Sequence, residues 1–434
     1  MLDDTSKCIN METKHIAAIV VTIIVIAGVC VALTQLGGGG DESYRSDNTD
    51  GRLMIYGNAN NDDYIDQNDI DYLESIIAGD SEETAYADAN QDGRIDQNDI
   101  DMVQRMINGE SMTVYYYNDL IGGASPVSYP VEGVVPILAE VVLANKILGN
   151  DDNVRGYMGS MDPVLFSDLG DGVTVFSESG NIPIETLSKL DVDAVVSLPT
   201  SSYITNESEI TQNGISVIRL GFRDADPTAA YLTYGFLIGQ EDRANRYAQF
   251  VDQTLDSIEQ KISENCSDSE RIRGMVLGYN VIYGRISDYG NVLEMAGAVN
   301  AVDWYEHRYV RDGMEWLYEY DFDYIVGRVS QGGYDYSQAT EGADVETVWN
   351  NYNTTYALTE AGHNGSIVLI NTSVPTIINA AYLAAIFYPD IFGSDYGDEV
   401  HQEYIDLFID NLAEQGYDVS DGLFVITEET IGKN

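Results

Sequence analysis

The chain has 434 residues, of which 72 are acidic and 21 basic, and its formal net charge is −51. Because a nucleic-acid partner requires a basic face against its phosphates, this balance excludes DNA and RNA binding. The length is sufficient for two or three domains. An acidic surface of this kind suits a salty or cation-rich exterior, but it does not specify a ligand.

The N-terminal region contains one apolar segment, Ile16–Leu36, long enough to cross a bilayer. Two lysines precede it and a glycine-rich, acidic stretch follows, so the bulk of the chain should lie outside the cell. We therefore predict a cytoplasmic stub and a single-pass anchor in residues 1–36, then a flexible linker in 37–52. The alternative is a cleaved signal with a lipid on Cys30.

A twelve-residue pattern beginning at Asn58 recurs at Asp88, and Ile-Asp-Gln-Asn-Asp-Ile-Asp is identical in both copies. Oxygen-bearing side chains fall at loop positions 1, 3, 5, 9 and 12, with a main-chain carbonyl at position 7, which is the spacing of an EF-hand calcium loop except that position 12 is Asp instead of Glu. The alternative is an acidic surface hairpin that merely resembles such a loop. The predicted ligands of two calcium ions are Asn58, Asn60, Asp62, Tyr64, Asp66 and Asp69 in the first loop and Asp88, Asn90, Asp92, Arg94, Asp96 and Asp99 in the second.

The two loops are not equivalent. Position 6, where the loop turns sharply, is Gly93 in the second copy and Asp63 in the first, and position 1 of the first copy is the uncharged Asn58. Glycine adopts a positive φ more readily than aspartate does, so we expect the second site to bind calcium more tightly. Residues 53–110 carry 15 acids and 2 arginines, so this segment should be weakly folded without cations.

A helical pattern of apolar residues follows each loop and ends at Gly79 or Gly109. A loop followed by one helix, repeated about 30 residues later, resembles a dockerin module, here residues 53–110. Dockerins are calcium-dependent domains that bind cohesin domains outside the cell. The resemblance implies either a tether to a cohesin-bearing surface partner or a calcium-stiffened spacer. The implied cohesin-facing residues are Gln67, Asn68, Gln97 and Asn98.

From Thr113 onward, strands alternate with helices, which indicates an α/β fold with helices covering parallel sheets. We predict one lobe at about 113–240, a long amphipathic helix at about 241–263, and a second lobe at about 272–434. The predicted strands are 113–117, 153–157, 173–176, 194–198 and 215–220 in lobe one, and 275–279, 324–326 and 367–370 in lobe two. Further helices are predicted at 139–148 and 184–190.

This arrangement, over about Thr113 to Asn411, resembles the helical-backbone substrate-binding proteins of ABC importers that capture ferric siderophores, haem and cobalamin. Six segments match that family in the same order, although the proline usual before the strands at 194 and 324 is missing here. The segments are 182–196, 214–218, 235–244, 293–300, 314–326 and 383–392.

The resemblance places a metal chelate between the lobes, near loops that follow the strands. It also implies an ABC permease as partner, which in that family is contacted by an acidic residue on each lobe. The corresponding residues here are Glu185 and Glu315. The alternative is that each acid only compensates a helix dipole. An arginine in the cleft could hold an anionic chelate, or could form only a surface salt bridge. The predicted ligand-binding residues are Tyr157, Met158, Thr200, Ser201, Tyr279, Tyr283, Arg285, Arg328 and Asn371.

Two other functions remain open from the sequence. A dockerin-bearing carbohydrate hydrolase would require paired carboxylates, but acids are too common here for any pair to be informative. No Gly-x-Ser-x-Gly, His-Glu-x-x-His or P-loop motif is present, which argues against an enzyme. The third possibility is an adhesion or scaffold protein that keeps the fold without a ligand. The acidity and the uncleaved anchor together suggest an archaeal source.

Overall fold

The computed structural model describes residues 52–432, apart from 160, 171, 178–179, 225, 279–280, 285–286, 303–308, 311–316 and 318–321. The predicted anchor Ile16–Leu36 and Cys30 lie outside these residues. Within the described residues, no helix is both long and apolar enough to span a membrane.

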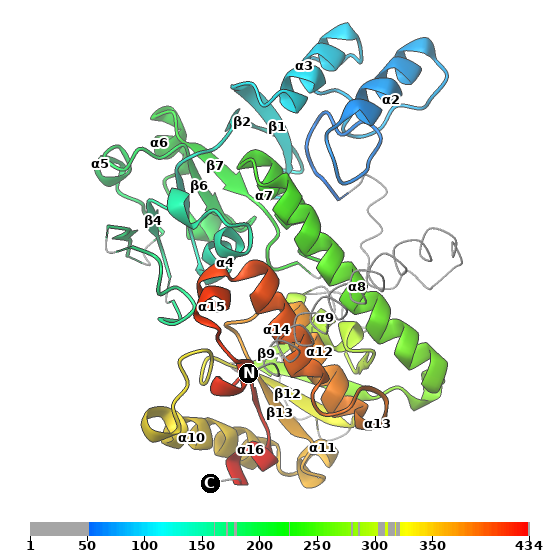
Figure 1. The fold of residues 1–434 in the computed structure, drawn as a ribbon, viewed down its shortest axis with the longest axis vertical. Helices are drawn as coiled ribbons and strands as arrows, with labels where there is room; N and C mark the ends of the chain where they lie inside the picture. Colours follow the sequence, from blue (N-terminus) through cyan, green and yellow to red (C-terminus); the bar gives the residue numbers. More distant parts are fainter. Residues whose placement is uncertain are drawn as a thin grey trace, which may run out of the picture. The chain divides into compact units, whose positions relative to one another are not determined.

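The repeated loops lead into two helices, α2 (Gln67–Ala78) and α3 (Gln97–Ile107), as the sequence predicts (Figure 1). Each helix begins with a capping box in which the aspartates at loop positions 9 and 12 bond reciprocally to the backbone. Gly79, with φ 79°, and Gly109, with φ 65°, take the left-handed conformation that ends each helix. The second half of each repeat therefore follows from its local sequence.

A β-hairpin of β1 (Met112–Asn118) and β2 (Gly123–Tyr129) connects this module to the larger domain. The strand at 113–117 was predicted, but β2 was not. Residue Ile55 forms a β-bridge with Tyr116 of β1, so the start of the module runs along this hairpin as an additional short strand. The module and the hairpin are thus joined by backbone pairing.

Lobe one contains a parallel sheet in the order β3-β6-β7. The predicted strand at 153–157 is confirmed except at its start: Asn153 still belongs to the 3₁₀ turn Asp151–Asn153, Val154 is extended and forms a parallel bridge with Val134, and Gly156–Tyr157 is β4. The predicted helix at 184–190 ends earlier, at Leu187. The elements are β3 (Val134–Pro136), α4 (Ala139–Ile147), β4 (Gly156–Tyr157), β5 (Thr174–Val175), α5 (Ile184–Leu187), β6 (Ala194–Ser197), α6 (Glu207–Gln212), β7 (Ser216–Arg219) and α7 (Thr228–Leu237).

The 25-residue helix α8 (Glu241–Asn265) links the two lobes, close to the range predicted for it (Figure 1). Its mean composition is polar, but one face is buried, and it packs against α7, α12 and α9. A helix with a single apolar stripe can contact both lobes while leaving its other face to solvent.

Lobe two is built on a seven-stranded sheet in which β8, β12 and β13 run parallel, as predicted, while β9, β11 and β14 are antiparallel additions. Helices α12 and α14 pack closely on each other and connect this lobe with α8. The elements are β8 (Arg273–Gly278), β9 (Val281–Tyr283), α9 (Asp288–Met295), β10 (Val299–Asn300), β11 (Tyr309–Val310), β12 (Tyr324–Val329), α10 (Gln338–Tyr356), α11 (Glu360–His363), β13 (Ile367–Asn371), α12 (Thr376–Phe387), α13 (Pro389–Phe392), α14 (Tyr396–Phe408), α15 (Asp410–Gln415), β14 (Val425–Ile426) and α16 (Glu428–Gly432).

Candidate functional site

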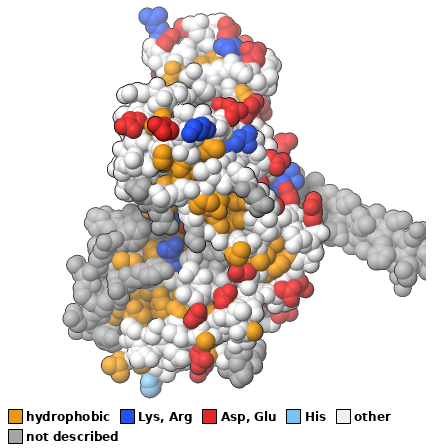
Figure 2. Space-filling view, turned by 90° about the vertical axis from the view of Figure 1, so that its left-hand side faces the viewer, with side chains coloured by type: hydrophobic (Ala, Val, Ile, Leu, Met, Phe, Trp, Pro, Cys, Tyr) orange, Lys and Arg blue, Asp and Glu red, His pale blue; other side chains and the backbone are white. Residues whose placement is uncertain are grey.

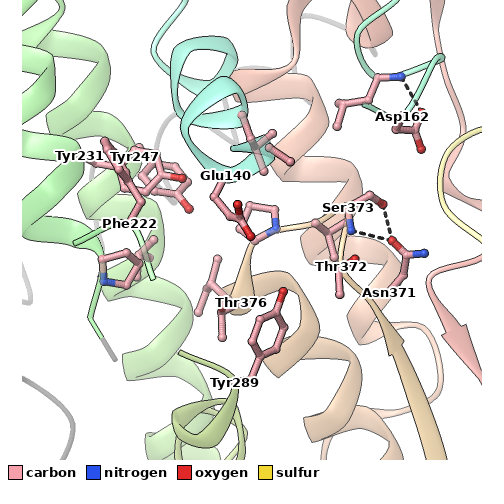
Figure 3. A pocket seen from close by; sticks show the side chains of 18 of the residues that line it. Glu140, Asp162, Phe222, Tyr231, Tyr247, Tyr289, Asn371, Thr372, Ser373 and Thr376 are labelled. Atoms are coloured by element: carbon pink, nitrogen blue, oxygen red, sulfur yellow. Dashed lines mark hydrogen bonds between the residues drawn. The ribbon is translucent and has the colours of Figure 1, made fainter. Parts of the chain in front are cut away.

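A cavity of about 470 Å³ lies between the lobes, where loops following β7, β12 and β13 meet the buried face of α8. Lobe one contributes the first turns of α4 and α7, and lobe two contributes α9 and the start of α12 (Figure 3). A crevice beyond the carboxyl ends of parallel strands is the usual ligand position in α/β proteins. The volume falls in the range of sites for organic ligands.

The cavity wall is largely aromatic and aliphatic. Phe222, Tyr231 and Tyr247 stand together on the lobe-one side, and Tyr289 of α9 faces them from lobe two (Figure 3). In the view turned by 90° from Figure 1, hydrophobic side chains gather around mid-height, with acidic and basic side chains beside them (Figure 2). Such a wall can contact a large, flat or ring-bearing ligand over much of its surface.

Six carboxylates also line the cavity, and none of its described lining residues is Lys, Arg or His. Glu140 forms an ion pair with Arg223, and Asp252 forms one with Arg52. Burial raises the pKa of Asp162, and the nearby charge of Asp335 raises it further. The described part of the cleft is therefore acidic. The six are Glu140, Asp162, Asp226, Asp252, Asp335 and Glu341.

Helices α4, α7 and α12 are among those that begin at the cavity. The first turn of α4 contains Glu140, and Asp226 accepts a hydrogen bond of 2.9 Å from the backbone of Thr228 at the start of α7. No side chain caps α12, which begins at Thr376. Helix N-termini carry unsatisfied N–H donors, so α12 offers these donors to an acceptor group on a bound ligand.

Of the residues predicted to bind the ligand, Asn371 lines the cavity. Its side chain is nevertheless occupied within the protein: the amide nitrogen donates to the carbonyl of Gln331 (2.9 Å), and the oxygen accepts from the backbone of Ser373 (2.7 Å) (Figure 3). Asn371 thus shapes the turn between β13 and α12.

The other described candidates do not line this cavity. In lobe one, Met158 is buried in a core cluster and Tyr157 lies in the short strand β4. The carbonyl of Thr200 accepts a hydrogen bond from the buried Arg219 (2.7 Å), and Ser201 is exposed. Strand-end reasoning fails here because the loop from Met161 to Phe166, and not the turn at Tyr157, reaches the cavity. Tyr279 and Arg285 lie outside the described residues.

Arg328 lies behind the wall instead of in it. Its guanidinium stacks on the ring of Tyr289, 4.2 Å from the ring centre, and donates to the hydroxyl of Tyr283 at 3.0 Å. Tyr283 is itself buried and also does not line the cavity. Because Tyr289 does line it, Arg328 holds a wall residue in place.

The sequence reasoning missed the aromatic residues of the wall. Phe222 follows β7 and could have been found by the same strand-end argument that was applied elsewhere. Tyr231 and Tyr247 lie within helices, where their spacing indicates only a buried face. Of the two acids predicted to meet a permease, Glu185 is exposed in the first turn of α5, and Glu315 lies outside the described residues.

The two calcium-type loops share one hydrogen-bonded frame. In each, the position-3 asparagine accepts from the backbone of position 5, and the position-12 aspartate accepts from the backbone of positions 3 and 9. Asp69 and Asp99 are fully buried, and burial raises the pKa of both, that of Asp69 to about 7. A buried carboxylate is stabilised in its charged form by a bound cation, so the frame fits calcium.

The two loops differ in the contacts made by the residue at position 1. Asp88 accepts from the backbone of Asp92 (3.2 Å) and Gly93 (2.9 Å), whereas the amide of Asn58 donates to two carbonyls. The side-chain oxygen of Asn58 is buried and has no hydrogen-bond donor. Gly93 has φ 85°, and Asp63 does not take a positive φ. Within the described residues, no three His, Cys, Asp or Glu side chains converge by themselves as a metal site, so either loop would also use amide or carbonyl oxygens.

The four residues expected to face a cohesin, Gln67, Asn68, Gln97 and Asn98, are all exposed. Gln67 donates to Asp71 (2.9 Å) and Gln97 donates to Asp101 (3.0 Å), one helical turn further along. The two surfaces therefore have the same local arrangement.

The calcium-loop module and the two-lobed domain each match a known protein family. Residues 132–373, more than half of the chain, match the periplasmic binding protein model, and residues 56–108 match the dockerin type I domain. No curated protein matches the sequence.

Several solved structures have a similar fold. They include the TroA-like periplasmic binding protein FepB from Veillonella parvula (TM-score 0.55, 16% identity, 71% of this chain and 98% of that chain). CeuE from Helicobacter pylori in a Ni-His complex gives 0.52 and 16%, over 70% and 99% of the chains. MolA from Haemophilus influenzae bound to molybdate gives 0.51 and 14%, over 68% and 97%. At these identities the likeness shows the fold alone.

Proposed function

The chain belongs to the periplasmic binding protein family, and we propose that it is the extracytoplasmic solute-binding component of an ABC importer that captures a chelated metal. The family consists of solute-binding proteins, so the chain is a binder and not an enzyme. A ferric siderophore is the preferred cargo, with haem and cobalamin as related candidates. The observation that carries the proposal is the aromatic cavity between the lobes.

The wall of this cavity favours a chelate over a bare ion. Among the described residues that line the cavity none is His or Cys, whereas aromatic rings from both lobes converge on one space (Figure 3). The acidic lining favours a chelate whose outer surface is neutral or positive, since like charges would be repelled in a desolvated cleft.

Thermal unfolding of the full-length protein in detergent tests the proposal. The probes are a tris-hydroxamate ferric chelate with a pendant ammonium, its N-acetylated neutral form, its N-succinylated anionic form, haem, cobalamin and free metal ions. A ligand present at 100 times its Kd stabilises the folded state by about 2.7 kcal/mol, which is readily seen as a rise in Tm. With the loops filled by saturating CaCl₂, we expect a further rise with one chelate class and none with free metal ions.

A matched pair of variants locates the binding. Asp335→Asn removes a charge from the cavity wall, and Asp344→Asn removes one from the exposed face of α10 in the same lobe. Asp335→Asn should change the order of affinities across the three hydroxamate chelates, whereas Asp344→Asn should leave it unchanged. Absence of a shift with every probe, well above micromolar concentration, would favour the scaffold function instead.

The remaining parts of the proposal concern attachment. We place calcium in the two dockerin-like loops, a cohesin-bearing surface protein against α2 and α3, and a membrane anchor in residues 1–36. The exposure of Gln67, Asn68, Gln97 and Asn98 supports the cohesin contact. If changing these four residues to Ala left the set of captured surface proteins unchanged, the module would serve as a spacer.

A further inference from the structure

Arg52 connects the first calcium-type loop with the wall of the solute cavity. Its Nη1 donates to both carboxylate oxygens of Asp252 at 3.0 Å, and its Nε donates to Asp63 of the loop at 3.2 Å. Asp252 belongs to α8 and lines the cavity. One guanidinium, only partly exposed, is therefore shared by loop position 6 and by the cleft.

The residues that follow Arg52 fix this connection in place. The backbone of Met54 donates to the hydroxyl of Thr233 in α7 (3.0 Å), and the backbones of Tyr56 and Tyr117 complete the pairing with β1. Leu53, Met54 and Ile55 are buried in the same hydrophobic cluster as α7 and α8. The module therefore shares a core with the binding domain, unlike a domain on a flexible tether.

The first loop also concentrates negative charge. Asp62, Asp63, Asp66 and Asp69 bring four carboxylates to this loop within twelve residues. Among the ion pairs of the described residues, the one that reaches this loop is made by Arg52.

We propose that calcium bound in the first loop stabilises the cleft-lining part of α8, and that Arg52 is the residue that couples the two. The side-chain oxygen of Asn58 at position 1 is buried and has no hydrogen-bond donor, so it is available to coordinate a cation. Without the cation, repulsion among the four carboxylates loosens the loop and withdraws Asp63 and Arg52 from Asp252. With it, the loop holds Arg52 against α8.

Position 6 of the first loop thereby gains a function. A glycine is expected there, and the second loop has Gly93. The first loop instead has a side chain that reaches Arg52. Binding at two coupled sites is reciprocal, so a solute that holds α8 in place would also raise the affinity of the first loop for calcium. The extracellular calcium level would then set how firmly the cleft is formed.

Hydrogen–deuterium exchange of the full-length protein, with CaCl₂ or with chelator, tests the coupling without any solute. In the parent we expect calcium to slow exchange about ten-fold in residues 58–69 and in residues 248–256 of α8, the size expected for one strengthened charge-assisted hydrogen bond. Residues 343–356 of α10, none of which lines the cavity, should not respond.

Two variants and one control separate coupling from general stability. Arg52→Met and Asp252→Asn should keep calcium protection at 58–69 and lose it at 248–256. Arg105→Met removes another module arginine, one whose pair with Glu110 stays within the module, and should keep both protections. The proposal is overturned if calcium leaves 248–256 unchanged in the parent, or protects it equally in Arg52→Met and Asp252→Asn. Because calcium is the only probe, these outcomes do not depend on whether the cleft binds a chelate.

Discussion

The calcium-loop module and the α12–α14 side of lobe two both bury polar groups, but they satisfy them in opposite ways. The module buries the carboxylates Asp69 and Asp99 among many other acids. Lobe two buries His401 between the hydroxyls of Tyr334 (2.9 Å, to Nε2) and Tyr382 (3.1 Å, to Nδ1). In the first arrangement the carboxylates meet backbone N–H donors and keep their negative charge uncompensated, whereas the second is neutral and complete within the chain.

The tyrosines also fix the state of the histidine. Tyr382 donates to Asp398 (2.9 Å), so its oxygen accepts from Nδ1–H, and Nε2 then accepts from Tyr334. Burial lowers the pKa of His401 to about 3, so the ring is neutral. We therefore expect stability to depend on calcium in the module and on pH in lobe two.

Calcium removal should give the largest effect. If both loops bind calcium at 100 times its Kd, the ions contribute about 5 kcal/mol to the free energy of unfolding, and a chelator removes this. Thermal unfolding with CaCl₂ and with EGTA measures the loss, and MgCl₂ at equal concentration controls for ionic strength. Equal Tm values in CaCl₂ and EGTA would show that neither loop is a calcium site.

Acid should act on the other region. His401 has a folded pKa of about 3, below the unfolded value of about 6.5, so the unfolded chain binds the proton more tightly. Its contribution to stability is complete above about pH 6.5 and is lost as pH falls toward 3, at up to about 1.4 kcal/mol per pH unit. The free energy of unfolding, measured with denaturant in saturating calcium, should therefore fall more steeply between pH 7 and 4.5 in the parent than in His401→Gln.

The matched control for this prediction is His363→Gln, which changes an exposed histidine in the same lobe. It should retain the slope of the parent, because this change leaves the buried ring of His401 and its two tyrosine partners in place. A parallel slope in the parent and in His401→Gln would mean that His401 does not resist protonation.

The two regions also differ in what the sequence could predict. Helices α2 and α3 and the oxygen positions were predicted because contiguous residues determine a calcium loop and a capping box. The hairpin partner β2 was missed because its Gly-Ala-Ser-Pro-Val-Ser-Tyr sequence reads as a loop; its Pro126 pairs with Tyr115 where a strand prediction would not place proline. The pair between Arg52 and Asp252 joins residues 200 positions apart, and no local pattern indicates it.

The cavity lies between the lobes, where the sequence predicts a ligand, but its lining differs from the residues predicted for it. The loops that follow β12 and β13 border this cavity, as strand-end reasoning predicts. It could not determine on which side of β12 Arg328 would point, because successive side chains of a strand face opposite ways and the partner rings come from β9 and α9. Which residue lines a site depends on contacts distant in sequence.

Replacing Arg328 should have the smallest effect on stability and on affinity. Arg328→Lys keeps a positive charge but loses the planar stack on Tyr289 and the bond to Tyr283, which costs about 1 kcal/mol of stability. Because the ring of Tyr289 would shift while the cavity stays open, the affinity for a chelate should fall only a few-fold, as measured by calorimetry. The control is Arg273→Lys, which changes an exposed arginine of the same sheet. A hundred-fold loss for the anionic chelate alone, with Tm unchanged, would instead mean that Arg328 reaches the ligand, as the sequence first suggested. A small loss of affinity together with a lower Tm is the result expected of a residue that acts through the wall it supports.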